Sequence, residues 1–323
     1  MIRSLYHHGA EVPATGLSRE QMRAALADAG GVLWVDMSGA SPEEVELVLT
    51  RVFAFHPLSI ADCLQGVRRP KLDNYGDYIF FVVYADDQST PLEDVNTVEL
   101  DFYLGPNFVV THHPLPLPAI DRVIEQAMQD EIPMLLGADV LASEILRAVA
   151  SSYQPTVDFL SAAVAGVEVE VLTAPTSNTL HRMHELRHDL LKVRRVLAPQ
   201  QEIMNRLATH ELQPIALQNR LYFRELADRF GEMVDTTEKL GNSIRDTLQT
   251  HLSITFNQTN NLLRLVAAMV AFLVPTTLLA LLYNMRLITI QALSLPHAGT
   301  VITGVTLLIA LLLAAYVYRR GWQ

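Results

Sequence analysis

Two segments near the C-terminus decide the fold: residues 265–285 read LVAAMVAFLVPTTLLALLYNM, and residues 298–318 read AGTVITGVTLLIALLLAAYVY. Each segment is 21 residues long and contains no Asp, Glu, Lys, Arg or His. An α-helix of this length crosses a hydrocarbon layer of ~30 Å. Because only twelve residues separate the segments, the sequence predicts a membrane protein whose C-terminal region forms a helical hairpin in the lipid bilayer.

The rest of the chain is polar and acidic. The whole protein has a formal net charge of −11, and the charged residues after Arg264 are three arginines, so residues 1–264 carry −14. The negative electrostatic field of this part repels nucleic acid and concentrates cations near the surface. It therefore favours metal ions over DNA or RNA as partners. The single cysteine, Cys63, excludes an intrachain disulfide and is typical of a reducing cytosol.

Charges beside the two segments indicate their orientation. Arg319 and Arg320 directly follow the second segment, and basic residues collect on the cytoplasmic side of membrane proteins. The first residues contain no apolar signal segment. We therefore expect both termini in the cytoplasm, although Arg286, in the external loop, opposes this rule.

The N-terminal part is predicted to be a mixed α/β domain. Runs of β-branched and aromatic residues predict strands, and Gly105-Pro106 predicts a hairpin turn between the last two. Ser41-Pro42-Glu43-Glu44 is typical of a helix start. The predicted strands cover residues 31–36, 78–84, 97–104 and 107–111, and the predicted helices cover residues 41–53 and 58–64.

Helical periodicity dominates from about residue 136. It predicts a helical pair over residues 136–172 and 178–208. From Leu226 to His251, a seam of mostly apolar residues recurs in steps of four and three, the spacing of a helix that packs on neighbouring helices. We expect one helix over residues 214–284, ~105 Å long, which needs copies of itself for stability. The alternative is two helices, broken near residues 257–261.

These patterns predict a fold in successive parts, an α+β cytosolic domain that continues into a stalk helix and a transmembrane hairpin. The parts are a cytosolic α/β domain (1–135), a helical pair (136–213), a stalk helix (214–261), a first span (262–285), an external loop (286–297), a second span (298–318) and a basic cytosolic tail (319–323).

Motifs along the chain resemble the CorA family of divalent-cation transporters, also called two-transmembrane GxN proteins. They are FHPLSIAD at residues 55–62, RPKL at 69–72, YGDY at 75–78, LGPNFVVT at 104–111, YFRE at 222–225 and NQTN at 257–260. Their shared order and spacing carry the resemblance, which covers about residue 30 to the C-terminus. It implies a funnel-shaped homopentamer in a bacterial cytoplasmic membrane, with the long helices around a pore and the second spans in an outer ring.

The chain departs from the family at the outer end of the first span. Where the family has Tyr-Gly-Met-Asn, this chain has Tyr283-Asn284-Met285-Arg286, and no acid follows in the loop. An inward ring of five Arg286 side chains would repel a dication by ~1 kcal/mol each at ~8 Å in a water-like dielectric, or ~5 kcal/mol in all before salt screening. Alternatively, Arg286 reaches outward to lipid phosphates. A further alternative is that divalent cations do not pass through this pore mouth. The protein would then pass another ion, sense cations or have lost transport.

One stripe of the long helix is predicted to face the pore. Its members recur in steps of three or four: Asn260, Leu263, Ala267, Val270, Val274, Thr277, Leu281 and Asn284. Asn260, Thr277 and Asn284 would form polar rings, whereas Leu263, Val270 and Val274 would form narrow apolar rings that gate by dewetting. The alternative is that the Asn and Thr side chains bond between helices.

Two acids match a regulatory metal site of the family. The resemblance implies that ions bound between neighbouring cytosolic domains hold the pore shut, and Asp62 and Glu225 match acidic positions of that site. Carboxylate oxygen is the ligand that Mg²⁺ prefers. Ala61 replaces the acid that the family has beside Asp62, so one ligand is lost, and the alternative is that these are ordinary surface acids.

A different motif raises the alternative of a zinc metalloprotease. His184-Glu185-Leu186-Arg187-His188 fits H-E-x-x-H, in which two histidines bind zinc and the glutamate is a general base. His181 lies on the same helical face, so His181, His184 and His188 also form a candidate regulatory zinc site. Arginines and lysines crowd this helix and disfavour a dication.

The sequence therefore favours a pentameric transporter over an enzyme. It predicts passive uptake of Mg²⁺, Zn²⁺ or Co²⁺ through a pore that the cytosolic domain gates, with the ion as substrate and possible regulator and with no organic cofactor. The sequence contains no phosphate-binding loop and no charged residue inside either span. We therefore expect neither nucleotide hydrolysis nor a proton relay to drive transport. The alternatives are a channel for different ions and a non-conducting scaffold that senses cations.

Overall fold

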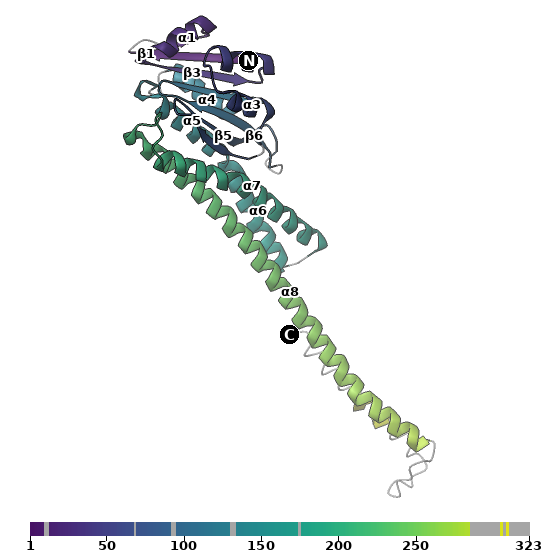
Figure 1. Ribbon diagram of the computed structural model, residues 1–323. Coiled ribbons are helices and arrows are strands. Elements are labelled where there is room, and N and C mark those ends of the chain that lie inside the picture. The colour runs from purple at the N-terminus through teal and green to yellow at the C-terminus, as the bar shows by residue number, and fades with distance from the viewer. Residues whose placement is uncertain are drawn as a thin grey trace. The chain divides into compact units, whose positions relative to one another are not determined.

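The computed structural model describes residues 1–9, 13–67, 69–91, 95–129, 134–173, 176–284, 304–305 and 308–309. The chain divides into two compact units, Met1–Asp246 and Thr247–Gln323. The first unit contains a mixed β-sheet with helices on both faces (Figure 1). A long helix, α8, begins in the first unit and continues into the second.

The described residues form one sheet of seven strands in the order β2-β1-β3-β7-β6-β5-β4. Neighbouring strands are antiparallel except for β3 and β7, which pair in parallel. The strands are β1 (Ile2–His8), β2 (Ala14–Thr15), β3 (Gly31–Ser38), β4 (Lys71–Asn74), β5 (Ile79–Asp86), β6 (Thr97–Leu104) and β7 (Phe108–His113). The four predicted strands are confirmed as β3, β5, β6 and β7. The other three were not predicted because their short or polar sequences lack a β-branched run.

The predicted Gly105-Pro106 turn is also confirmed, because β6 and β7 form an antiparallel hairpin around it. The backbone N–H of Gly105 donates to the carbonyl of Phe108 at 3.0 Å. A Cβ atom at position 105 would lie 2.1 Å from the Phe108 ring, so this turn requires glycine. The turn sets the register in which Asp101 lies opposite His112.

Three helices cover one face of the sheet: α1 (Arg19–Ala27), α2 (Pro42–Arg51) and α3 (Pro57–Gln65). The predicted start of α2 is confirmed, since Ser41 and Glu44 form a reciprocal capping box. The helix predicted over residues 58–64 is confirmed as α3. These helices and the sheet bury a common apolar core whose members include Met22, Leu33, Val48, Leu49, Ile60, Cys63, Phe80, Tyr103 and Val110.

The other face is covered by helices that follow the sheet in the chain. α5 packs on β5, β6 and β7, and α7 packs on β4 and β5. The helices are α4 (Pro118–Met128), the short 3₁₀ helix η1 (Met134–Leu136), α5 (Ala138–Ser152), α6 (Gln154–Thr173) and α7 (Ser177–Thr209). The single helix predicted over residues 136–172 is wrong, because it is divided into α5 and α6 at Tyr153. Pro155 has no N–H to bond the carbonyl four residues earlier, so the helix breaks there.

The predicted long helix is confirmed as α8 (Arg220–Asn284), an uninterrupted helix of 65 residues. It begins at Arg220, not at Pro214, after a 3₁₀ turn, η2 (Leu217–Asn219). The buried carboxylate of Asp139 holds the preceding segment, because its Oδ2 accepts hydrogen bonds from the Ala216 N–H at 2.9 Å and the Asn219 amide at 3.0 Å.

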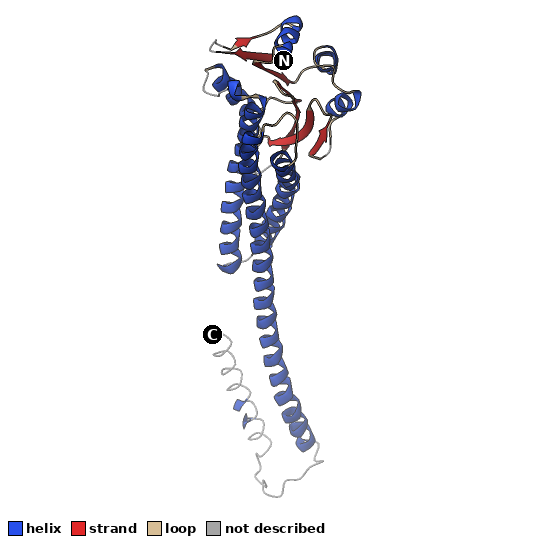
Figure 2. Cartoon of the chain, turned by 60° about the vertical axis from the view of Figure 1, so that its left-hand side comes forward, coloured by secondary structure: helices blue, strands red, loops and turns tan. Residues whose placement is uncertain are grey.

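The chain itself covers the start of the α8 seam. Leu226, Phe230 and Ile244 are buried inside the first unit. α6 and α7 run beside this part of α8 (Figure 2), and Arg194 of α7 forms an ion pair with Glu238 of α8 at 3.0 Å. The predicted packing of the seam on neighbouring helices is therefore met within the chain for this stretch.

A buried polar network ties β1, β3, β7 and α4 together on the α5 side of the sheet. The Asp36 carboxylate accepts hydrogen bonds from Arg3 at 2.7 Å and from the Thr111 hydroxyl at 2.7 Å, and it lies 3.2 Å from Nε2 of His113. Arg3 also pairs with Asp121 at 2.6 Å. Burial alone would raise the pKa of Asp36, but the hydrogen bonds and charges of its partners outweigh burial and lower this pKa.

The lowered pKa of Asp36 predicts an acid-dependent loss of stability. An aspartate that is ionised more easily in the folded chain stabilises the fold above its ordinary pKa of 3.8 and loses this effect as the pH falls through the lower, folded value. In urea unfolding between about pH 5 and pH 3, the stability advantage of the native chain over Asp36→Asn should be constant down to about pH 4 and shrink below it. An advantage that is undiminished at about pH 3 would contradict this assignment.

Candidate functional site

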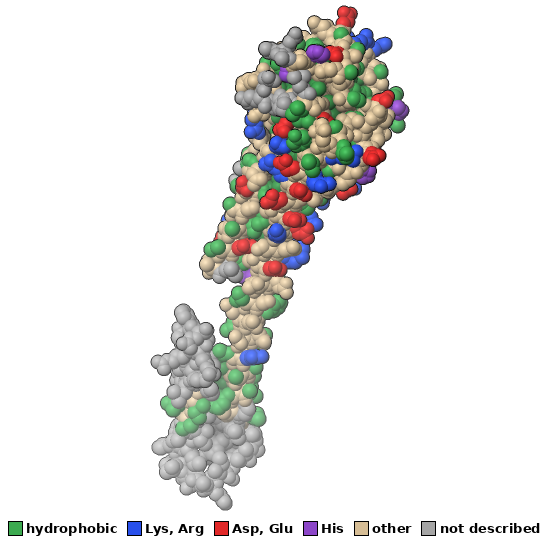
Figure 3. All heavy atoms as spheres, turned by 90° about the vertical axis from the view of Figure 1, so that its left-hand side faces the viewer, with side chains coloured by type: hydrophobic (Ala, Val, Ile, Leu, Met, Phe, Trp, Pro, Cys, Tyr) green, Lys and Arg blue, Asp and Glu red, His purple; other side chains and the backbone are tan. Residues whose placement is uncertain are grey.

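The second unit contains the membrane-length part of α8. Among the described residues, one helix is long and apolar enough to cross a membrane, Leu217–Leu278, with a mean hydropathy of 1.7 in its most apolar window. Hydrophobic side chains gather on the second unit, whereas charged side chains gather on the first (Figure 3). Pro275 lies inside the helix without ending it, which is tolerated in membrane helices when other groups bond the freed carbonyl.

The two sides of this helix differ in exposure. The predicted pore stripe is exposed along its length; Leu263, for example, is 62% exposed and Val274 is 58% exposed. Leu265, Met269, Phe272 and Thr276, by contrast, are half-buried within the second unit. Positions two apart are rotated by about 200° around an α-helix, so Leu263 and Leu265 point in nearly opposite directions. The stripe therefore lies on the broad face that the second unit itself leaves open, together with other exposed residues such as Leu262 and Leu278.

The structure locates most of the predicted pore residues. Asn260, Leu263, Ala267, Val270, Val274, Thr277 and Leu281 lie on α8 and are exposed. The Thr277 hydroxyl donates to the Leu273 carbonyl at 2.8 Å in its own helix, so its donor is satisfied locally while its oxygen can still accept a hydrogen bond. α8 includes Tyr283 and ends at Asn284. Met285 and Arg286, the loop at 286–297, most of the second span and the tail at 319–323 lie outside the described residues.

Both candidate regulatory acids have basic partners in the chain. Asp62, at the end of the HPL motif in α3, pairs with Lys71 at 2.5 Å. Burial lowers the pKa of Lys71, but hydrogen bonds to Asp62 and Asp73 outweigh burial and raise it, so this ammonium stays charged. Glu225 is more exposed and lies 3.5 Å from Arg147 of α5. A cation that binds Asp62 would therefore compete with Lys71 for this carboxylate.

The histidine motif lies on the exposed side of α7. His181, His184 and His188 are exposed, and His181 lies 3.3 Å from the Glu185 carboxylate. His188 is 3.8 Å from Asp189. In the part of the chain that the structure describes, the ligand atoms of these three histidines do not form a group close enough to hold one ion.

A different group of ligand side chains does converge, and sequence reasoning missed it. Cys63 of α3, Asp101 of β6 and His112 of β7 place one ligand atom each within 4.8 Å of one another. His112 and His113 are adjacent residues of a strand, whose side chains point to opposite faces of the sheet. They do point apart, but each joins a buried cluster: His112 lies beside Cys63, and His113 lies beside Asp36. The detectable signal was the hairpin register, which places Asp101 opposite His112.

Burial dominates the electrostatics of this group. It raises the pKa of the Cys63 thiol well above the usual value, and the negative charge of Asp101 adds to the effect. It also raises the pKa of Asp101, although the hydrogen bond to His112 opposes the shift. Burial therefore disfavours a negative charge on either side chain when no cation is bound.

Comparisons with known proteins agree with the family resemblance and with the fold. The family model described as "CorA-like Mg2+ transporter protein" matches residues 29–319. This chain belongs to the CorA family. The "Cobalt/magnesium transport protein CorA" of Thermotoga maritima is 23% identical over 296 residues, which cover 91% of this chain and 84% of that protein. The "Zinc transport protein ZntB" of Cronobacter sakazakii is 23% identical over 240 residues, which cover 71% of each chain.

A solved structure agrees with the family assignment. The CorA magnesium transporter of Methanocaldococcus jannaschii superposes with a TM-score of 0.73 at 18% identity, covering 98% of this chain and 97% of its own. At this identity the likeness concerns the fold, a mixed sheet with flanking helices and one long helix. CorA proteins are metal-ion transporters and not enzymes, so the metalloprotease alternative is excluded.

Proposed function

We propose that this CorA-family chain transports divalent metal cations passively across the cytoplasmic membrane. The observation that carries the proposal is the long helix α8, whose exposed stripe bears an asparagine, a narrow apolar stretch and a threonine in succession. In a ring of such helices, the polar positions replace part of the ion's hydration shell and the apolar positions close the path when water leaves.

The pore requires several copies of the chain. Leu263, Val270 and Val274 are more than half exposed, and apolar faces of this size are covered by lipid or by other helices. We propose a homopentamer in which residues 220–261 form the stalk, residues 262–285 the pore-lining span and residues 298–318 the outer span. Residues 286–297 then form an external loop, and both termini are cytoplasmic. Membrane potential and concentration gradient supply the driving force.

The family resemblance favours a gate controlled by the first unit, Met1–Asp246, which we place in the cytosol and call the cytosolic unit. Asp62 and Glu225 are its candidate cation ligands, and their partners Lys71 and Arg147 compete with the ion for the carboxylates. Cation binding at these acids would therefore depend on concentration and would release the ammonium of Lys71. The cation substrate is Mg²⁺, Co²⁺ or Zn²⁺, the ions in the names of the two relatives.

Ion flux into proteoliposomes tests this function. The purified full-length chain should take up at least one of Mg²⁺, Co²⁺ and Zn²⁺, each supplied separately beside K⁺ and Cl⁻ controls. If Arg286 reaches outward to lipid phosphates, the Arg286→Asn variant should carry the same ion within about twofold, because an outward arginine adds little field on the axis. Divalent uptake by the variant alone would instead identify an arginine ring that blocks cations. Transport of K⁺ or Cl⁻ without divalent ions would overturn the proposal.

A further inference from the structure

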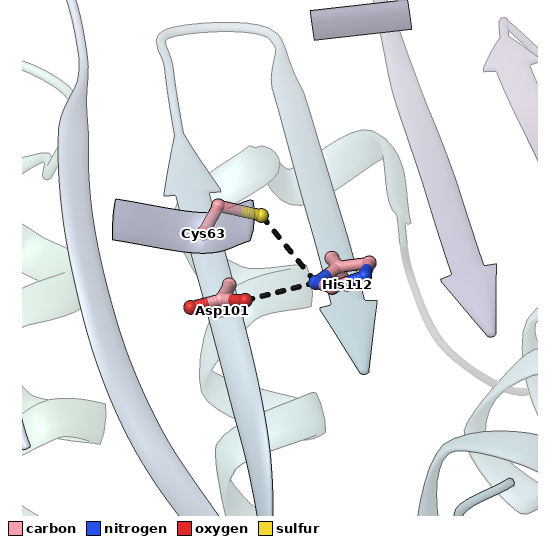
Figure 4. A group of neighbouring side chains, drawn as sticks. All are labelled: Cys63, Asp101 and His112. Carbon is pink, nitrogen blue, oxygen red and sulfur yellow. Dashed lines mark hydrogen bonds and ion pairs between the residues drawn. The ribbon is translucent and has the colours of Figure 1, made fainter. Parts of the chain in front are cut away.

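Three chemically different ligands meet inside the cytosolic unit. The thiol of Cys63 lies 3.3 Å from Nδ1 of His112, and a carboxylate oxygen of Asp101 lies 2.9 Å from the same nitrogen. The side chains come from a helix and from two neighbouring strands (Figure 4). Cys63 is separated by 38 residues from Asp101 and by 49 from His112 along the chain, so the fold itself holds the group together.

The geometry differs from that of a catalytic relay. In a nucleophile–histidine–acid relay, the nucleophile and the acid contact different ring nitrogens, so that a proton can pass across the imidazole. Here the sulfur and the carboxylate both face Nδ1. One ring nitrogen carries at most one proton, so it cannot donate fully to two partners. The three ligand atoms instead lie within 4.8 Å of one another, close enough to bind one metal ion.

One ligand atom is left without a partner. The Oδ1 atom of Asp101 is buried and has no hydrogen bond, although the residue is only 1% exposed. A buried polar group without a hydrogen bond destabilises the fold. A cation bound beside Asp101 would remove this destabilisation, either by contacting both carboxylate oxygens or by ordering a water molecule against Oδ1.

An ion can reach the group from the surface. A hollow of about 270 Å³ is lined in part by Gly39, Pro42, Leu64 and His112. The His112 side chain is 12% exposed, whereas Asp101 and Cys63 are buried. The imidazole therefore lies between the open hollow and the two inner ligands. Entry requires a movement of this ring, and no strand has to separate.

We propose that Cys63, Asp101 and His112 bind one thiophilic divalent metal ion, Zn²⁺ or Co²⁺, in the cytosolic unit. Thiolate, imidazole and carboxylate are the three side-chain ligands of Zn²⁺, whereas Mg²⁺ prefers oxygen ligands and retains water. On binding, the thiol proton leaves to solvent, and the proton of the hydrogen bond between Nδ1 and Asp101 moves to Nε2 or to solvent, so that Nδ1 can coordinate. The bound ion would cross-link α3, with its HPL motif, to β6 and β7.

Cobalt absorption on the purified full-length chain tests the site. After removal of metal with a chelator, Co²⁺ should produce a thiolate-to-cobalt charge-transfer band at one equivalent per chain, and Zn²⁺ should abolish it while excess Mg²⁺ should not. Because Cys63 is the single cysteine, every thiolate signal reports this site alone. Absence of the band in the native chain would overturn the proposal, and this result does not depend on whether the chain transports ions.

Variants and thiol protection separate this site from other zinc ligands. Cys63→Ser should abolish the charge-transfer band, and Asp101→Asn should weaken Co²⁺ binding at least about tenfold. His184→Gln, on the exposed histidine motif, is the matched control and should leave the band unchanged. If the buried variants fail to fold, the native chain still decides the question, because Zn²⁺ but not Mg²⁺ should slow alkylation of Cys63. Equal alkylation rates with and without Zn²⁺ would contradict the site.

Discussion

Leu263→Asn should raise divalent-ion flux about tenfold or more in proteoliposomes, if the exposed stripe of α8 lines the pore. A polar ring retains water in a constriction that leucine would empty, and lowering the barrier by about 1.4 kcal/mol accelerates passage tenfold. Leu263 is 62% exposed, so the change disturbs little packing inside its own chain. Flux should be measured with the ion that the native chain carries best, at equal amounts of reconstituted protein.

Leu265→Asn is the matched control for this change. The residue type is the same and the position is two residues further on, but the side chain is half-buried on the other face of α8. Asparagine at this position should leave the flux per correctly assembled protein near the native value or lower it. If Leu265→Asn opens the path and Leu263→Asn does not, the pore stripe has been assigned to the wrong face.

Asp36→Asn should lower the free energy of unfolding of the first unit by about 3–5 kcal/mol, because it removes one member of a buried charge network. Asp36 and His113 are fully buried, and Arg3 is mostly buried against them. The amide preserves the size of the side chain but withdraws the negative charge that these groups face. We expect the variant to fold at neutral pH and to unfold at a lower urea concentration.

Tryptophan fluorescence provides the measurement. Trp34 is buried in β3, and its indole N–H donates to the Thr111 hydroxyl at 3.1 Å, so it reports directly on this network. The chain has two tryptophans, and Trp322→Phe removes the second. The control is Asp73→Asn, a half-exposed partner of Lys71, which should cost about 0–1 kcal/mol. Equal costs for the two variants would show that the Asp36 network contributes no more than a surface ion pair.

In the first unit, local sequence pattern predicted some strands and missed others. The strand formers at β3, β5, β6 and β7 were predictable because their alternation and their turn lie within a few neighbouring residues. The division between α5 and α6 also had a local cause, Pro155, which helical periodicity alone hid. By contrast, β1 and β4 contain polar residues, and they form strands because they pair with β3 and β5.

Local sequence pattern could predict only part of the group formed by Cys63, Asp101 and His112. The Gly105-Pro106 hairpin fixes the pairing of Asp101 with His112, so these two ligands were within reach of a register argument. Cys63 is not, because its distance from them depends on how α3 packs on the sheet. The histidine motif at 181–188 has the right spacing in the sequence, but its side chains lie on an exposed helix face without a third converging ligand among the described residues.

The sequence by itself determined the apolar segments of membrane length, the acidic part that precedes them, the long helix and the family, because composition, periodicity or the order of the motifs indicates each of them. Only the tertiary structure decided that the chain covers the start of its own α8 seam, that Asp36 joins a buried network, and that Cys63 meets Asp101 and His112. The physical reason is that periodicity specifies which face of an element is apolar, whereas the packing of distant elements selects the side chains that meet behind that face.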